Sequence, residues 1–400
     1  MLQWRQCRRN KADSRTSAPG EIREARSKCP TAFGRELSGI ESAPLQSIHM
    51  LIEGIFAAVT TPFYPDERVY YRKLEANVAR YSRSQLAGMV VLGSTGEAPA
   101  LDDVETREVL RTAAEAATPE KVLIAGVNRE SLRAVVELAE AAAKFEYDAV
   151  LVRTPTYYST QMTPSVVASY FRAVADRSPL PVVLYNIPRC VPYQIPVDMV
   201  AELAHHPNII AIKDSSGSLE RIQGIVQATR GVAKRTVTVT PVFEAVTARM
   251  MSAVVSLPAT FVSAGDLAGG PALAVAPPSA PLRTRTKEVG FQVLTGSASI
   301  ILPSLEAGGA GAILGFGACA PEACYEVYFA WKDRDQKLAA EMQERIVKPN
   351  QRIVAEMGIA GVKYACDFNG YYGGYPRQPL LPLTAEQKAE IESLLDKIRN

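Results

Sequence analysis

A regular alternation of strand-like and helix-like segments constrains the fold of this chain more than any other feature. From residue 51 onward, short apolar runs alternate with stretches in which apolar residues recur three and four positions apart, as on one face of a helix. Strands are predicted at residues 55–60, 89–92, 122–127, 149–152, 181–185, 209–213, 291–294 and 312–315. Helices are predicted between them, at residues 74–85, 104–117, 132–144, 165–175, 198–204 and 219–229. Eight strands alternating with helices favour a closed parallel sheet, the (β/α)8 TIM barrel.

An open, doubly wound sheet is the alternative fold for the same alternation. In that fold a glycine-rich G-x-G-x-x-G turn commonly follows the first strand. Here the first predicted strand leads into Thr60-Thr61-Pro62-Phe63. We therefore prefer the barrel.

Three parts of the chain depart from the barrel rhythm. Residues 1–50 are rich in Arg, Ser, Pro and Gly and lack an apolar period, so we expect a disordered extension before a barrel domain at 51–400. Residues 235–290 are interpreted as an insert on the face where helices lead into strands, with a strand at 236–240, a helix at 242–252 and a loop at 268–286. Three further helices, at 322–345, 352–366 and 385–399, predict a C-terminal helical extension.

Composition argues against several classes of function. A formal net charge of +2 gives no electrostatic case for binding nucleic acid, and no apolar run approaches the roughly 20 residues that cross a bilayer. The six cysteines contain no C-x-x-C pair, which favours free thiols in a reducing compartment. We expect the cytoplasm, because acidic residues in the first 50 positions argue against a mitochondrial presequence. Only three histidines are present, which disfavours a multi-histidine metal site or a Ser-His-Asp triad.

Lys213 stands at the end of the sixth predicted strand. It follows Ile209-Ile210-Ala211-Ile212, a run typical of a strand that is buried on both faces. A buried ammonium must be paired, reach the strand end or lose its proton through desolvation, and a neutral lysine amine attacks ketones to form a Schiff base. The alternative is a solvated lysine just beyond the strand.

Other polar side chains follow the second, fourth and fifth predicted strands, whose C-terminal ends meet at one mouth of a barrel. The second strand leads into Gly93-Ser94-Thr95-Gly96-Glu97, where hydroxyls and backbone N–H groups suit a small carboxylate. The fourth leads into Thr154-Pro155-Thr156-Tyr157-Tyr158, and the fifth ends in Tyr185-Asn186-Ile187-Pro188. A tyrosine at this mouth either relays protons or packs with its hydroxyl in water. With Lys213, these groups describe a Schiff-base enzyme acting on a 2-oxo acid.

In these motifs the chain resembles the dihydrodipicolinate synthase/N-acetylneuraminate lyase family of pyruvate-dependent class I aldolases. The resemblance covers nearly all of residues 53–400 except the insert. Its motifs are the Gly93 turn, the Tyr185 motif and, third along the chain, Ile212-Lys213-Asp214-Ser215-Ser216-Gly217. It implies a barrel that forms an imine with pyruvate and makes or cleaves a carbon–carbon bond to an aldehyde. It implies no metal or organic cofactor, because the protonated imine is itself the electron sink.

The resemblance also implies roles for individual residues. Lys213 would form the imine, and Tyr185 would shuttle protons, with Thr95 linking the tyrosines of the relay. Tyr157 would reach into a neighbouring subunit's site to complete this relay, which implies a homo-oligomer, either a dimer or a tetramer. The residues expected to bind substrate are Ser94, Thr95, Gly96, Ser215 and Arg189.

The acceptor side of the predicted site matches no single member of the family. Dihydrodipicolinate synthases place an arginine five residues after the tyrosine of strand five, where this chain has Cys190, with Arg189 displaced by one. Residues 153–185 and 368–374 are closest to 4-hydroxy-2-oxoglutarate aldolases, whereas Ser94-Thr95 and the Tyr185 motif are similar to sialate lyases.

The preferred activity is therefore cleavage of a 4-hydroxy-2-oxo acid, such as 4-hydroxy-2-oxoglutarate, to pyruvate and an aldehyde. 4-Hydroxy-tetrahydrodipicolinate synthase activity, with Arg189 replacing the missing arginine, is the alternative. A catalytically silent barrel that binds 2-oxo acids belongs to another class, and the presence of Lys213, Tyr185 and Thr95 argues against it.

Overall fold

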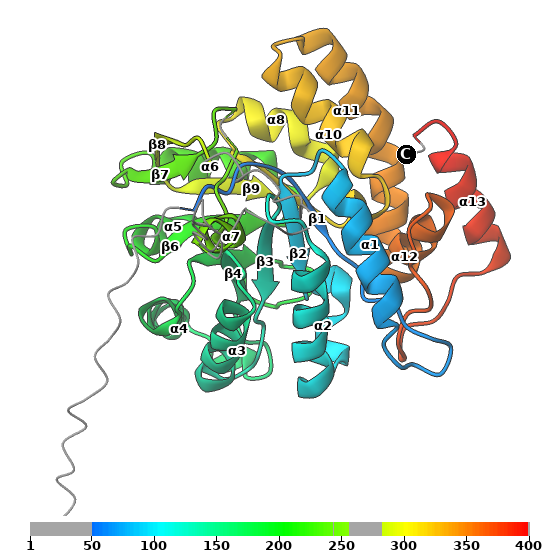
Figure 1. Ribbon diagram of the computed structural model, residues 1–400, viewed down its shortest axis with the longest axis horizontal. Helices are drawn as coiled ribbons and strands as arrows, with labels where there is room; N and C mark the ends of the chain where they lie inside the picture. The colour runs from blue at the N-terminus through cyan, green and yellow to red at the C-terminus, as the bar shows by residue number, and fades with distance from the viewer. Residues whose placement is uncertain (1–49, 243, 256–281, 399–400) are drawn as a thin grey trace, which may run out of the picture. The chain divides into compact units, whose positions relative to one another are not determined.

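The computed structural model describes residues 50–242, 244–255 and 282–398, and eight strands of this part form a closed parallel barrel (Figure 1). The order around the barrel is β1, β10, β9, β6, β5, β4, β3 and β2. The barrel strands are β1 Gly54–Ala58, β2 Gly88–Val91, β3 Val122–Gly126, β4 Ala149–Arg153, β5 Val182–Asn186, β6 Ile209–Asp214, β9 Gln292–Thr295 and β10 Gly311–Leu314. The predicted (β/α)8 barrel is confirmed, and the open sheet is not formed.

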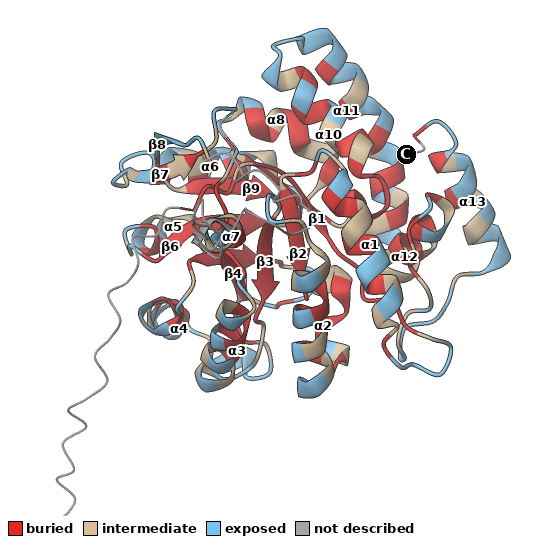
Figure 2. Cartoon of the chain, in the orientation of Figure 1, coloured by how far each residue is buried: buried red, intermediate tan, exposed pale blue. Residues whose placement is uncertain are grey.

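Helices follow the barrel strands along the chain and lie outside them (Figure 1). They are α1 Tyr71–Arg83, α2 Asp103–Ala116, α3 Leu132–Lys144, α4 Pro164–Arg177, α5 Val197–Leu203, α6 Leu219–Thr229, α8 Ile301–Glu306, α9 Phe316–Cys319 and α10 Pro321–Lys332. Several begin at side chains that cap free backbone N–H groups, as where Asp102 and Glu105 form a reciprocal capping box at α2. Their apolar stripes face the barrel, and Figure 2 shows that their outer faces are exposed.

Two apolar layers separate the inside of the barrel from the outside. The inner layer contains strand residues such as Phe56, Leu151 and Ile313 and no helix residue, whereas the outer layer joins alternate strand residues to the helices. Because side chains alternate along a strand, β5 sends Val183 and Tyr185 inward and Leu184 outward. The inner layer thus fills the barrel beneath its C-terminal mouth.

The C-terminal extension is helical, as predicted, but its helices are shorter. The helix expected at 322–345 is two helices, α10 and α11 Gln336–Asn350, because Arg334 adopts a left-handed φ of 64° and Asp335 caps the new helix at Leu338. The helix expected at 352–366 is a π-helical segment, Gln351–Glu356, followed by α12 Gly358–Phe368. The last helix, α13, spans Ala385–Leu395.

Two strands and one helix of the predicted insert, which lies between α6 and β9, pack on the N-terminal end of the barrel. β7 Arg235–Val239 pairs with β8 Arg285–Val289 in an antiparallel ribbon, and Arg235 donates to the side chain of Gln292 at 2.8 Å. Helix α7, Ala248–Val255, begins six residues later than predicted. Its Arg249 pairs with Asp148 at 3.9 Å and donates to the carbonyl of Lys121, and these two residues immediately precede β4 and β3.

Two predicted irregular segments lie largely outside the described residues. The predicted loop at 268–286 lies outside the described residues up to position 281, and Thr286 belongs to β8 rather than to a loop. The predicted disordered extension, up to residue 49, lies outside the described residues as well. Within the described ranges, no helix combines the length and apolarity needed to cross a membrane.

Candidate active site

Lys213 and Tyr185 lie side by side near the C-terminal ends of β6 and β5. The two residues are direct partners in the parallel pairing of these strands, and the Lys213 ammonium donates to the Tyr185 hydroxyl at 3.4 Å. The ammonium also lies 4.4 Å from the centre of the Tyr185 ring. Lys213 is only 4% exposed and Tyr185 3%. Lys213 is therefore buried, and the alternative of a solvated lysine beyond the strand is wrong.

A β-bulge in β6 turns Lys213 toward the barrel interior. The pairing register shifts between Val182 and Val183, so Ile210 and Ala211 both face the inner layer, while Ile209 and Ile212 face the helices. Regular alternation would put Lys213 on the same side as Ile209, which is the outer side. The extra inward residue restores Lys213 to the inner side, next to Tyr185.

The turn after β2 contributes a second hydroxyl to this pair. Ser94 opens a 3₁₀ turn, Ser94–Gly96, and its hydroxyl lies 3.3 Å from the Tyr185 hydroxyl. Thr61, just after β1, donates to the Gly96 carbonyl at 2.7 Å. The hydroxyl of Thr95 instead lies close to Gly315, at the end of β10, where an added Cβ would sit 3.3 Å from it. The contact with Tyr185 is thus made by Ser94, whereas the family resemblance implies that Thr95 links the tyrosines.

Asp214, the residue after Lys213, organises a polar network on the outer side of the same strands. Its fully buried carboxylate accepts from Asn186 at 2.8 Å, from Arg221 at 2.6 Å, and from the amide and hydroxyl of Ser216 at 3.0 and 2.5 Å. Four donors satisfy a buried carboxylate that would otherwise be costly. The network ties together the residues that follow Tyr185 and Lys213. Asp214 belongs to the Lys213 sequence motif, but no local pattern in the sequence indicates this role.

Ser215 is held where β6 meets β9. Its amide donates to the Asn186 carbonyl at 2.8 Å, and a Cβ added to Gly296 would lie 1.9 Å from its hydroxyl. Only glycine therefore fits at position 296 with Ser215 in this place. The close approach puts the Ser215 hydroxyl at the end of β9, beside the mouth of the barrel.

Tyr157 is exposed and makes its ring contact with Tyr158. It is 80% exposed and packs edge-to-face against Tyr158, with ring centres 5.1 Å apart. Glu130 anchors its loop by accepting from the amides of Thr156 and Tyr157 at 2.7 and 3.0 Å and by pairing with Arg153 at 2.9 Å. Although partial burial raises the pKa of Glu130, these hydrogen bonds lower it to about 2, so the carboxylate stays charged.

Arg189 belongs to the loop after β5 and is directed toward the C-terminal extension. Its guanidinium donates to the carbonyl of Ala355, in the π-helical segment, and both Arg189 and Cys190 are exposed. The structure thus brings Lys213, Tyr185 and Ser94 into direct contact and places Thr95, Gly96 and Ser215 on adjoining strand ends. Tyr157 and Arg189 lie apart from that contact group.

Comparisons with known proteins agree with this fold. The sequence model described as the dihydrodipicolinate synthetase family matches residues 51–252 and 281–398. The chain is 28% identical over 350 residues to 4-hydroxy-tetrahydrodipicolinate synthase of Acidiphilium cryptum, covering 86% of this chain and 98% of that protein. It is 29% identical over 348 residues to L-threo-3-deoxy-hexylosonate aldolase of Hypocrea jecorina, covering 85% and 93%.

A solved structure shows the same fold. YagE, a prophage protein of the dihydrodipicolinic acid synthase family from E. coli K12 whose crystal structure contains pyruvate, matches with a TM-score of 0.69. The match covers 87% of this chain and 99% of YagE at 23% sequence identity.

The Asp214 network leads to a stability prediction. Replacing Asp214 by Ala should lower the free energy of unfolding by about 3–5 kcal/mol, because Arg221 and Asn186 would stay buried without their acceptor. Urea denaturation followed by circular dichroism measures this change. Asp66→Ala is the matched control: Asp66 pairs with Arg68 on the exposed surface, and the loss there should not exceed about 1 kcal/mol. Equal losses in both variants would contradict a special role for the network.

Proposed function

The chain belongs to the dihydrodipicolinate synthetase family of aldolases and lyases, and from that premise we propose that Lys213 forms the Schiff base with pyruvate. The observation that carries the proposal is the contact chain from the Lys213 ammonium to the Tyr185 hydroxyl at 3.4 Å and on to the Ser94 hydroxyl at 3.3 Å. A nucleophile within reach of a proton-transferring group is what imine chemistry requires, and such contacts are often long before substrate binds.

The proposed residues account for each proton in the cycle. The neutral Lys213 amine attacks the ketone carbon of the 2-oxo acid, and water leaves after Tyr185 delivers a proton to the departing hydroxyl. The deprotonated Tyr185 then takes the proton of the C4 hydroxyl as the C3–C4 bond breaks, and the protonated imine accepts the electron pair as an enamine. The aldehyde departs, Tyr185 returns its proton to C3, and water hydrolyses the imine to release pyruvate and Lys213.

The turn Ser94–Gly96 is the proposed site for the carboxylate of the 2-oxo acid. It offers the hydroxyls of Ser94 and Thr95 together with successive backbone N–H groups at the end of β2. Ser215, two residues after Lys213 and close to Gly296, is proposed to contact the remainder of the substrate. Exposed Tyr157 is proposed to complete the proton relay in the site of a second copy, which makes the working unit a homo-oligomer.

The preferred substrate is a 4-hydroxy-2-oxo acid such as 4-hydroxy-2-oxoglutarate. A relative at 29% identity is named an aldolase, which supports carbon–carbon cleavage as the activity. The alternative, synthesis of 4-hydroxy-tetrahydrodipicolinate, is supported by the name of the Acidiphilium relative. That activity would require Arg189 to bind a second carboxylate. Arg189 instead donates to the carbonyl of Ala355, which favours cleavage of a 4-hydroxy-2-oxo acid.

A reducing compartment, the cytoplasm, is proposed as the location. Among the described residues, Cys190, Cys324 and Cys366 are free thiols, and Cys324 and Cys366 are buried. Free thiols persist in reducing surroundings, whereas secreted proteins tend to pair them.

Reduction with borohydride in the presence of pyruvate tests the nucleophile. The imine should be trapped as a stable adduct that peptide mass spectrometry locates on Lys213, and Lys213→Met should abolish the adduct. Lys287→Met is the control, because Lys287 pairs with Glu53 near the N-terminal end of the barrel and should leave the adduct intact. Absence of an adduct in the unmodified protein, or its location on another lysine, would refute the proposal.

Replacing Tyr185 by Phe tests the proton shuttle. The ring stays in the inner layer while the hydroxyl is lost, so turnover should fall by about 10²–10⁴-fold, the usual contribution of a positioned acid or base. Pyruvate should still bind, as measured by isothermal titration calorimetry. Unchanged turnover would remove Tyr185 from the mechanism.

A substrate panel assayed in both directions tests the choice of reaction. Release of pyruvate from 4-hydroxy-2-oxoglutarate, followed with lactate dehydrogenase, should give a higher kcat/KM than condensation of pyruvate with aspartate semialdehyde. If condensation is faster and Arg189→Ala abolishes it, the synthase alternative holds instead.

A further inference from the structure

Glu97 is a buried carboxylate at the end of the turn that carries Ser94 and Thr95. It adopts a left-handed conformation, with φ of 54°, which non-glycine residues rarely hold without outside support. Its amide donates to the Ser94 carbonyl at 3.1 Å, so the turn ends on this residue. Whatever holds the Glu97 side chain therefore also holds the turn.

The support comes from the C-terminal extension. Lys363, on α12, pairs with the Glu97 carboxylate at 2.5 Å, and both side chains are almost wholly buried. The other carboxylate oxygen accepts from the backbone amide of Arg377 at 2.8 Å. Lys363 also donates to the carbonyl of Tyr375 at 2.6 Å. Burial lowers the pKa of Lys363 and the Glu97 charge opposes that effect, so the two charges depend on each other.

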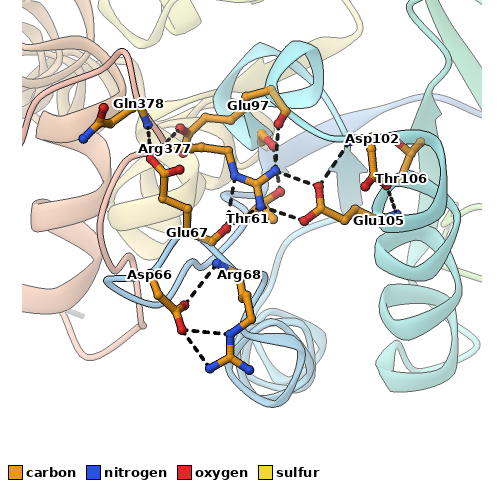
Figure 3. Close-up of polar contacts among 12 residues, drawn as sticks. Thr61, Asp66, Glu67, Arg68, Glu97, Asp102, Glu105, Thr106, Arg377 and Gln378 are labelled. Carbon is orange, nitrogen blue, oxygen red and sulfur yellow. Dashed lines mark hydrogen bonds and ion pairs between the residues drawn. The ribbon is translucent and has the colours of Figure 1, made fainter.

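A second ion pair fixes the segment that supplies this amide. The Arg377 guanidinium makes two contacts of 2.7 Å with the Glu105 carboxylate and donates to the Ala100 carbonyl at 2.7 Å (Figure 3). It also contacts the Glu67 carbonyl, and the next residue, Gln378, donates to the Glu67 carboxylate at 3.1 Å. Figure 3 shows this guanidinium between Glu67 and Glu105, with Glu97 beside it. Residues 377–378 are therefore bound both to the loop after β1, through Glu67, and to the region after the Ser94–Gly96 turn, through Ala100 and Glu105.

One aromatic ring links the two cations. Phe63 is fully buried, with the Lys363 ammonium 4.2 Å and the Arg377 guanidinium 4.3 Å from its ring centre. Cations in such positions are attracted to the ring face. Phe63 follows β1 closely, so the loops after two neighbouring barrel strands, β1 and β2, share one anchor in the C-terminal extension.

We propose that Glu97 and Lys363 are positioning residues for the 2-oxo-acid carboxylate, and that the C-terminal extension shapes this part of the site. The inference rests on the proposed function of the Ser94–Gly96 turn. Loss of the ion pair frees Glu97 to leave its left-handed conformation, which moves the Ser94 and Thr95 donors. Because those donors hold a group that does not react, ground state and transition state are weakened alike, so KM rises more than kcat falls.

Lys363→Met tests the inference, with pyruvate affinity as the readout. The concentration of pyruvate that half-saturates borohydride trapping should rise about 10-fold or more, the scale of a lost hydrogen bond to a charged group. The trapping level at saturating pyruvate should stay close to that of the unmodified protein. Arg249→Met is the matched control, since it also removes a buried cation from its carboxylate but at the opposite end of the barrel. It should lower the melting temperature without changing the half-saturating concentration.

A double-mutant cycle separates positioning from general destabilisation. Glu97→Gln keeps an acceptor for the Arg377 amide but removes the charge, so it serves if Lys363→Met fails to fold. The Glu97→Gln/Lys363→Met protein should bind pyruvate about as weakly as the weaker single variant, because both changes break the same contact. Losses that multiply, or folded variants with unchanged half-saturation, would overturn the inference. If the unmodified protein itself gives no adduct, the proposed function is refuted, and with it the positioning role that rests on it.

Discussion

One extra residue in β6 decides which side of the sheet Lys213 occupies, and the candidate site depends on that choice. With Ile210 and Ala211 both facing inward, Lys213 joins Tyr185 inside the barrel mouth and Asp214 faces the helices. A regular strand would exchange these two, burying the ammonium against apolar helix residues and turning the carboxylate toward Tyr185. The bulge therefore places the Lys213 ammonium inside the barrel and the Asp214 carboxylate on the side of the helices.

Each charge then finds partners suited to its side of the strand. On the outer side, Arg221, Asn186 and Ser216 satisfy the Asp214 carboxylate, and the residues next to the lysine and the tyrosine are locked together. On the inner side, Lys213 meets an aromatic ring and a hydroxyl and has no carboxylate hydrogen-bonded to it among the described residues. The lysine therefore lies next to the hydroxyl that is proposed to move protons, rather than in an ion pair.

The strand pattern was predictable because burial on both faces leaves a strong local signal. Eight apolar runs with helical segments between them implied a closed barrel, and closure brings the ends of β2, β5 and β6 together. The C-terminal helices were predicted less well. Arg334 and Gly358 take left-handed conformations that break two expected helices, and Asp335 caps a new helix after the first break. The late start of α7 goes with tertiary contacts, because Thr247 and Arg249 donate to carbonyls at the base of the barrel.

The sequence by itself determined the alternation of elements, hence the barrel, and the types of residue that its strand ends present. It also identified Lys213, Tyr185 and the Ser94–Gly96 turn as a set, because each follows a recognisable apolar run. Only the tertiary structure decided that Ser94 contacts Tyr185, that Arg189 turns to Ala355, and that Glu97 is held by Lys363 from 266 positions later in the chain. Such partners leave no local signal, because they meet only after the barrel closes and the C-terminal extension packs against it.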